Sequence, residues 1–193
     1  APASRAKAAT FALVVPAVAG RGWTVSIDTT SAKVAAFALD AGARIINDVS
    51  AGRDDWEIVL LAAERGVPLV LMHMLGEPRT MQDDPRYGDV VAEVRAFLAE
   101  RVAAAEAAGV PRRRCIVDPG IGFGKRLEHN LALLAGVGAL REIGCPVLVG
   151  PSRKRFLGEL TGVADPAGRV AGTLAACLAA RRGGATVFRV HDV

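Results

Sequence analysis

The chain has 193 residues, of which 51% are hydrophobic and 23% charged, and its net charge is 24 − 20 = +4. This balance excludes a disordered chain, and the length suits one domain with a real core. The longest apolar run, residues 11–20, contains Pro16 and is too short to span a bilayer, so we expect no membrane partner. Only Arg112–Arg114 and Arg153–Arg155 cluster basic residues and aromatic residues make up 5%, so we expect no nucleic-acid partner.

Short runs rich in Val and Ile recur along the chain, and each ends in polar residues. They predict strands at residues 24–28, 44–48, 68–73, 115–118, 146–150 and 186–191. Continuous rather than alternating apolar runs are typical of strands buried on both faces of a parallel sheet.

Helical patterns fill the intervals between these runs. They predict helices at residues 10–18, 31–41, 54–66, 86–108, 128–143 and 165–183. Asp54 and Glu57 indicate a capping box for the third helix, and Asp165 followed by Pro166 indicates an N-cap for the last. The chain begins at Ala1 without Met and is helical so early that we expect it to be a piece of a longer protein.

The alternation of strands and helices fits two architectures. A doubly wound parallel sheet needs five or six strands, whereas a (β/α)₈ barrel needs eight and about 250 residues. Counting six strands alone favours the doubly wound sheet. No repeat or linker divides the chain, so residues 1–193 are expected to form a single domain.

Polar side chains follow every predicted strand, and in both architectures ligands bind at the carboxyl ends of the strands. A single polar residue at the end of a strand can simply cap the next helix, but polar residues at the ends of six strands, all on one rim, predict a binding site. The residues concerned are Asp28, Asn47, Asp48, Met72, His73, Asp118, Ser152, Arg153, Lys154, Arg189 and His191.

The segment from Asp118 to Lys125, DPGIGFGK, matches neither the phosphate-binding GxxxxGK loop nor GxGxxG. Its glycines allow the backbone to approach a flat ligand, on which Phe123 can stack; a flexible loop is the alternative.

One basic group follows the predicted strand at 146–150, and another lies on the last predicted strand, at 186–191. Lys154 is expected to face a ligand, and Arg153 and Arg155 to face solvent. Arg189 and His191 lie two residues apart, so they point the same way and suit a phosphate or pyrophosphate; a buried salt bridge with Asp192 is the alternative.

Histidines and cysteines indicate no metal site. His73, His129 and His191 lack metal-ligand spacing; His129 is expected to face solvent, and the role of His73 stays open.

The three cysteines form no CxxC pair and lie among apolar residues, so they predict buried free thiols and a reducing, cytoplasmic location.

Six segments in order and spacing, from Trp23 to Val193, resemble dihydropteroate synthase. They are SIDT at 26–29, IINDV at 45–49, VLMHM at 70–74, DPGIGFGK at 118–125, VGPSRK at 149–154 and RVHD at 189–192. The resemblance implies a (β/α)₈ TIM barrel, an α/β fold of which this chain carries about strands three to eight. The family's first two strands, its NxTxDSF and GGESTR segments and its last helix have no counterpart here. Pro151 stands where the family usually has Thr.

The resemblance also implies an enzyme, a transferase of folate biosynthesis. It condenses 6-hydroxymethyl-7,8-dihydropterin diphosphate with p-aminobenzoate, giving 7,8-dihydropteroate and pyrophosphate. The implied pterin-binding residues are Asp28, Asn47, Asp118, Lys154, Met72 and Val49.

By the same resemblance Arg189 and His191 bind the pyrophosphate, and Ser152, Lys154 and Phe123 border the p-aminobenzoate. Lys154, Arg189 and His191 are the implied catalytic groups, since they support the departing anion. Mg²⁺ is expected to bind with the pyrophosphate, with no metal ligand from this chain. The family is a sulfonamide target and often forms a homodimer. Because the two absent loops help bind magnesium and pyrophosphate, we expect the chain alone to be poorly active.

Two alternatives remain. A pterin-binding methyltransferase domain, which moves a methyl group from methyltetrahydrofolate to a corrinoid, shares the Asp, Asn and Asp residues but lacks the Ser-Arg-Lys and Arg-x-His pairs. A truncated paralogue could bind a pterin or a partner protein without turnover.

Overall fold

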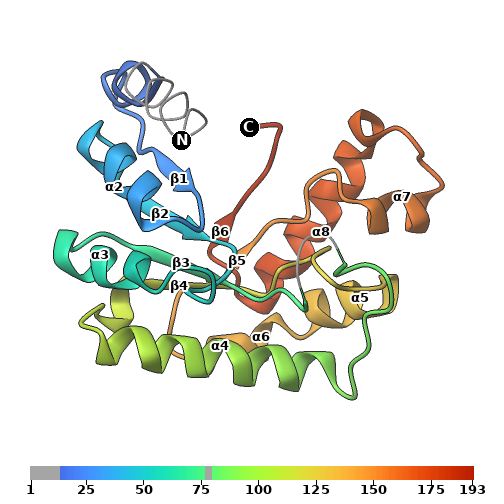
Figure 1. Cartoon of the computed structure of the whole chain (residues 1–193). Helices are drawn as coiled ribbons and strands as arrows, with labels where there is room; N and C mark the ends of the chain where they lie inside the picture. The colour runs from blue at the N-terminus through green and yellow to red at the C-terminus, as the bar shows by residue number, and fades with distance from the viewer. Residues whose placement is uncertain (1–13, 77–79) are drawn as a thin grey trace. The chain divides into compact units, whose positions relative to one another are not determined.

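The computed structural model describes residues 14–76 and 80–193, in which short strands alternate with helices (Figure 1). In chain order the elements are β1 (Ser26–Asp28), α2 (Ala32–Asp40), β2 (Ile45–Asp48), α3 (Glu57–Arg65), β3 (Leu69–Met72), α4 (Val90–Ala107), the 3₁₀ helix η1 (Arg112–Arg114), β4 (Cys115–Asp118), α5 (Leu127–Ala135), α6 (Val137–Arg141), β5 (Leu148–Val149), α7 (Arg155–Thr161), the 3₁₀ helix η2 (Pro166–Arg169), α8 (Val170–Gly183) and β6 (Val187–Phe188). Residues 14–19 are helical, whereas the start of the helix predicted at 10–18 lies outside the described residues.

The chain divides by its internal contacts into two compact units. One consists of Ala1–Leu71 with Arg101–Cys115, and the other of Met72–Glu100 with Ile116–Val193. No helix in the described ranges is both long and apolar enough to cross a membrane.

In the first unit, parallel strands pair in the order in which they follow one another along the chain. β1 pairs with β2, which places Asp28 opposite Asn47, and β2 pairs with β3, which places Asn47 opposite Val70. Ile46 and Leu69 are fully buried in this layer, as the continuous apolar runs predict.

The second unit keeps the same sequential order. Val117 of β4 forms a parallel bridge with Val147, and Leu148 of β5 pairs in parallel with Val187 of β6. A doubly wound sheet reverses its strand order at a switch point, whereas the wall of a (β/α)₈ barrel follows the chain. The doubly wound sheet favoured by counting strands is therefore wrong, because the number of strands carries no information about their order.

Two helix starts differ from the prediction because a neighbouring aspartate caps the helix. Asp55 rather than Asp54 lies at the start of α3: one of its carboxylate oxygens accepts the N–H of Glu57 (3.2 Å), and the other accepts the N–H of Ala32 (2.8 Å). The Asp54–Glu57 capping box is not formed. α4 begins at Val90 rather than near residue 86, and the carboxylate of Asp89 accepts two N–H groups of its first turn.

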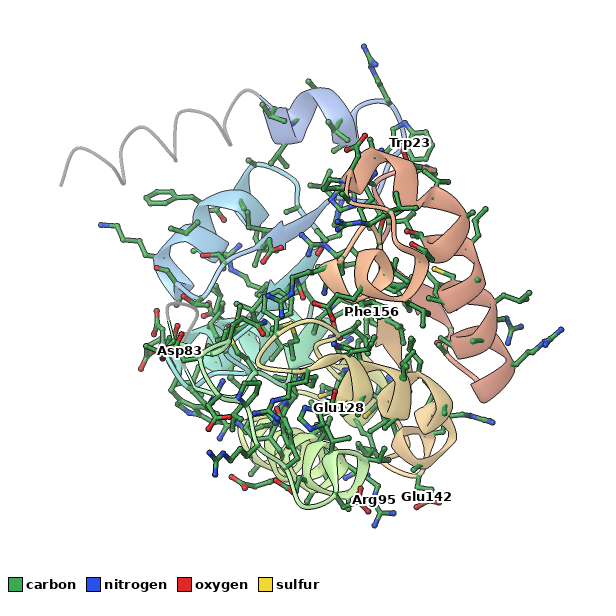
Figure 2. The ribbon with its side chains drawn as sticks, turned by 90° about the vertical axis from the view of Figure 1, so that its right-hand side faces the viewer. Trp23, Asp83, Arg95, Glu128, Glu142 and Phe156 are labelled. Atoms are coloured by element: carbon green, nitrogen blue, oxygen red, sulfur yellow. The ribbon has the colours of Figure 1, made fainter. Side chains whose placement is uncertain are left out.

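The helix predicted at 128–143 is divided into α5 and α6 at Gly136. A Cβ at this position would lie 2.8 Å from Val91, so the glycine permits a close approach to α4. Nearby, Arg95 of α4 forms an ion pair with Glu142, which follows α6, at the surface (Figure 2). Asp165 caps a 3₁₀ turn as predicted, accepting the N–H of Ala167 (3.0 Å), and α8 follows this turn.

Candidate functional site

The loop from Asp118 to Lys125 packs against the end of β3 within the second unit. The carbonyl of Asp118 accepts the N–H of His73 (2.9 Å), and its buried carboxylate accepts the N–H of Gly120 (2.7 Å). Gly120 has φ +67°, and a Cβ there would lie 1.9 Å from the carbonyl oxygen of His73. A Cβ at Gly124 would lie 2.8 Å from the carbonyl oxygen of Leu75. These two glycines therefore permit a close approach to the chain itself.

Lys154 faces this loop from the segment after β5. Its ammonium donates to the carbonyl of Ile121 and lies 4.5 Å from the centre of the Phe123 ring. Burial lowers the pKa of Lys154 to about 8, while the charge of Asp118 raises it and Arg189 lowers it further. Burial likewise raises the pKa of Asp118, and Lys154 is the strongest of the groups that oppose that rise. The carboxylate and the ammonium thus support each other's charged forms.

The Ser152–Lys154 turn is held in an unusual backbone conformation. Arg153 has φ +57°, and its N–H donates to Thr173 Oγ1 of α8 (3.0 Å) while its carbonyl accepts from Arg169 Nη1 (3.0 Å). Its guanidinium forms two hydrogen bonds with the carboxylate of Asp192, of which Nε to Oδ2 is 3.0 Å. Arg153 was predicted to face solvent, and it is partly exposed, with its guanidinium paired at the surface to Asp192. This partner lies thirty-nine residues along the chain and gives no local signal.

Ser152, Lys154, Arg189 and His191 come together around a cavity of about 170 Å³. His191 donates its N–H to Ser152 Oγ (3.2 Å), and its Nδ1 lies 2.9 Å from the same oxygen. β6 ends at Phe188, so Arg189 and His191 lie just beyond the strand rather than in it. Both are exposed and Asp192 pairs with Arg153, which argues against the alternative of a buried salt bridge with Asp192.

Lys154 also lines a second cavity, of about 250 Å³. Its lining includes Phe123, Lys154, Arg155 and Phe156, the last of which is buried near the start of α7 (Figure 2). Arg155 is exposed and pairs with Glu159 (2.9 Å), as expected of a solvated helix start. Lys154 therefore lines a cavity with an aromatic wall and also the cavity that Arg189 and His191 line.

The remaining predicted residues lie at other strand ends. In the first unit, Asp28 ends β1 and is exposed, Asn47 lies opposite it and is buried, and Val49 follows β2 and is partly buried. In the second unit, Met72 is buried at the end of β3. The pterin contacts assigned to these four residues stay predictions.

Asp48 organises a loop instead of presenting its carboxylate at the rim. It is fully buried, and its oxygens accept from the N–H of Ser50 (2.8 Å), the hydroxyl of Ser50 (2.7 Å) and the N–H of Gly52 (2.5 Å). Burial raises its pKa, and these hydrogen bonds oppose the rise. Arg101 supports the same loop by donating to the carbonyl of Ala51 (2.9 Å).

Sequence reasoning missed a buried contact between His73 and Lys125. His73 Nδ1 lies 3.0 Å from Lys125 Nζ, and its ring packs edge to face on Phe97 at 5.0 Å. His129, expected to face solvent, is partly buried: its Nδ1 accepts the N–H of Arg126 (3.2 Å), and its ring contacts Tyr87. Fifty-two residues separate His73 from Lys125, so no local pattern could have shown their contact.

Metal ligands do not gather in the described residues, where no group of three or more His, Cys, Asp or Glu side chains could hold an ion. Of the three cysteines, Cys115 and Cys145 are buried as predicted and Cys177 is partly buried, and none of the three forms a disulfide.

Sequential parallel strands alternating with helices, with an anion-suited cavity beyond β5 and β6, define an α/β-barrel protein with a ligand site at the carboxyl ends of its strands. The family model described as pterin binding enzyme matches residues 5–191, and the chain belongs to that family, among the dihydropteroate synthases.

Relatives in this family are similar over most of the chain. The dihydropteroate synthase of Mycobacterium leprae is 50% identical over 93% of this chain and 66% of its own length, and that of Synechocystis sp. is 47% identical over 88% and 58%. The chain thus spans about two thirds or less of the length of these curated relatives.

Solved structures agree with this placement. The Thermus thermophilus dihydropteroate synthase in complex with 6HMPPP is 52% identical and has a TM-score of 0.87 over 93% of this chain and 70% of that one. The Xanthomonas albilineans enzyme in complex with 7,8-dihydropteroate is 47% identical with the same TM-score, over 93% and 66%. The predicted fold, part of a (β/α)₈ TIM barrel, is confirmed.

Proposed function

We propose that this chain acts in the dihydropteroate synthase reaction, the condensation of 6-hydroxymethyl-7,8-dihydropterin diphosphate with p-aminobenzoate. The observation that carries the proposal is that Lys154 lines two cavities. One has the aromatic wall of Phe123 and suits a flat ring, and the other has Arg189 and His191 and suits an anion. Two of the solved relatives are described in complex with 4-aminobenzoic acid and with 6HMPPP, which supports the proposed substrates.

The chemistry then needs positioning and charge rather than a covalent enzyme intermediate. Arg189 and His191 hold the pyrophosphate while the bond between the pterin methylene carbon and the pyrophosphate oxygen breaks and its electron pair leaves with the oxygen. The nitrogen of p-aminobenzoate attacks the resulting cationic methylene, and that nitrogen loses a proton to solvent. The buried carboxylate of Asp118 accepts hydrogen bonds from the amino-pyrimidine edge of the pterin, and Lys154 donates to the ring's acceptors.

Mg²⁺ is part of the proposal as an ion that accompanies the pyrophosphate, whose oxygens are the ligands it prefers. Because the described residues offer no cluster of metal ligands, they do not form a site for it on their own, and none of the steps above depends on it. When bound, the ion neutralises charge on the leaving group.

A homodimer and a cytoplasmic location complete the proposal. Leu160, Leu174 and Leu178 on α7 and α8 are 57%, 65% and 55% exposed, which is typical of a surface that another protein copy covers. Sedimentation velocity would contradict the dimer if the chain stayed monomeric at all concentrations. Cysteines without a disulfide, two of them buried, are usual in a reducing compartment.

The proposed function predicts that the chain binds dihydropterin diphosphate and inorganic pyrophosphate, measured by isothermal titration. Arg189→Gln should lower the affinity for each of these two ligands about 10- to 100-fold, because a charge-assisted hydrogen bond contributes roughly 1.5–3 kcal/mol. Arg182→Gln, an exposed arginine at the end of α8, is the matched control and should leave both affinities unchanged. A chain that ignores pyrophosphate but binds methyltetrahydrofolate would instead be the methyltransferase domain, and one that ignores every pterin would be a partner-binding module.

A further inference from the structure

Lys125 is buried in the second unit, and the proposed mechanism does not use it. Only 2% of it is exposed. Its ammonium lies 3.0 Å from His73 Nδ1, 2.9 Å from the carbonyl oxygen of Phe123 and 3.4 Å from the carbonyl oxygen of His73. These three acceptors match the three N–H groups of a charged lysine, which requires the histidine to carry its own proton on Nε2. All three acceptors are neutral, so the buried charge is stabilised by dipoles rather than by a direct ion pair.

The contacts of Lys125 join the glycine-rich loop to the end of β3. The carbonyl of Phe123 belongs to the loop, and both acceptors of His73 belong to the segment after β3. Other side chains also hold the loop: Asn130 Oδ1 accepts the N–H of Gly122 (2.7 Å), and the Tyr87 hydroxyl donates to the carbonyl of Gly124 (2.8 Å). Lys154 donates to the carbonyl of Ile121 in the same loop, whereas Lys125 binds the carbonyl of Phe123 itself and so fixes the backbone that carries Phe123.

The charge of Lys125 also acts on Asp118. Burial raises the pKa of this carboxyl, and the opposing groups, in order of effect, are Lys154, the N–H of Gly120, Lys125 and Arg189. Burial lowers the pKa of Lys125 to about 7, while Asp118 raises it and Lys154 lowers it further. A carboxylate that is to accept hydrogen bonds from a pterin has to be ionised, and each nearby positive charge favours that form.

We infer that Lys125 is a positioning residue: held on His73 beneath the loop, it fixes Phe123 and keeps Asp118 in the charged form that receives the pterin. This inference rests on the proposed function, because it assigns Asp118 to the pterin. Its effect is expected on the acid side of the pH profile of pterin binding. There, protonation of Asp118 removes the acceptor.

The test compares the pH dependence of 6-hydroxymethyl-7,8-dihydropterin binding in the wild type and Lys125→Met. The ligand lacks the pyrophosphate, so contacts of Arg189 and His191 with that group do not contribute, and its own ionisation is common to all variants. Lys125→Met should shift the acid midpoint of binding upward by about 1 pH unit, because an opposite charge nearby commonly lowers a carboxyl pKa by that much or more. Lys125→Arg keeps the charge and should restore the wild-type midpoint. Lys33→Met, at an exposed lysine of α2, is the matched control and should not move it.

Each outcome decides between the claims. If the wild type binds no pterin, the proposed function fails; if it binds and the midpoint is the same in Lys125→Met, the inference alone is wrong. A purely structural role would lower affinity equally at every pH. Should Lys125→Met not fold, the ¹⁵N shifts of the His73 ring in the wild type decide: the inference expects an unprotonated Nδ1 at neutral pH, and a protonated Nδ1 would overturn it.

Discussion

We expect Gly120→Ala to lower the free energy of unfolding by about 3 kcal/mol or more. The added Cβ would lie 1.9 Å from the carbonyl oxygen and 3.0 Å from the carbonyl carbon of His73, and backbone atoms cannot move aside as a flexible side chain can. The residue also has φ +67°, which costs any L-residue about 1–2 kcal/mol. The loop would have to move away from β3, which breaks the hydrogen bond between the His73 N–H and the Asp118 carbonyl.

Gly162→Ala is the matched control for this substitution. Gly162 has a similar φ of +73°, but a Cβ there would meet nothing within 4 Å, so only the backbone cost of about 1 kcal/mol is expected. Urea denaturation followed by far-ultraviolet circular dichroism measures both variants. Equal losses in the two would show that the contact at His73 is not tight and that only the left-handed backbone matters.

The strands were predictable because burial on both faces leaves a mark in the sequence. Continuous runs such as residues 44–48 and 115–118 match β2 and β4 to within a residue. Strand ends near the surface were harder to predict: the run at 186–191 forms a strand only over Val187–Phe188, and the N–H of Arg189 adds one more hydrogen bond to β5, at Val149 (3.2 Å). The order of the strands was not predictable from their count, since order depends on contacts between segments far apart in the chain. The barrel followed from the resemblance alone.

The position of the candidate site was predictable, but its internal contacts were not. Parallel strands place their carboxyl ends on one edge, so Ser152, Lys154, Arg189 and His191 could be expected together, and they do line one cavity. Which polar group meets which is decided by folding geometry. Asp48 shows the limit: it follows Asn47 in the sequence, yet its carboxylate turns inward to three donors of its own loop.

Lysine at position 154 is expected to be the most sensitive residue of the site, with Lys154→Met weakening dihydropterin diphosphate binding about 100-fold. The ammonium borders both cavities, so its loss removes a donor to the ring and a charge beside the anion. The methionine has a similar length and no charge. It therefore fills the space beside Phe123 while leaving Asp118 without its strongest positive neighbour.

The pH dependence of the wild type separates this charge effect from a loss of packing. Burial lowers the pKa of Lys154 from 10.5 to about 8, so the group is charged below about pH 8 and becomes neutral above it. Asp118 and Arg189 are the charged groups that act on it. Affinity for inorganic pyrophosphate, measured by titration calorimetry from pH 6 to 10, should therefore fall through about pH 8 in the wild type. Lys154→Met should lack this alkaline step, and Lys154→Arg, which stays charged, should move it beyond the measured range. Lys33→Met, the control, should retain the wild-type fall in affinity. If Lys154→Met also showed this fall, the titrating group would be a different one.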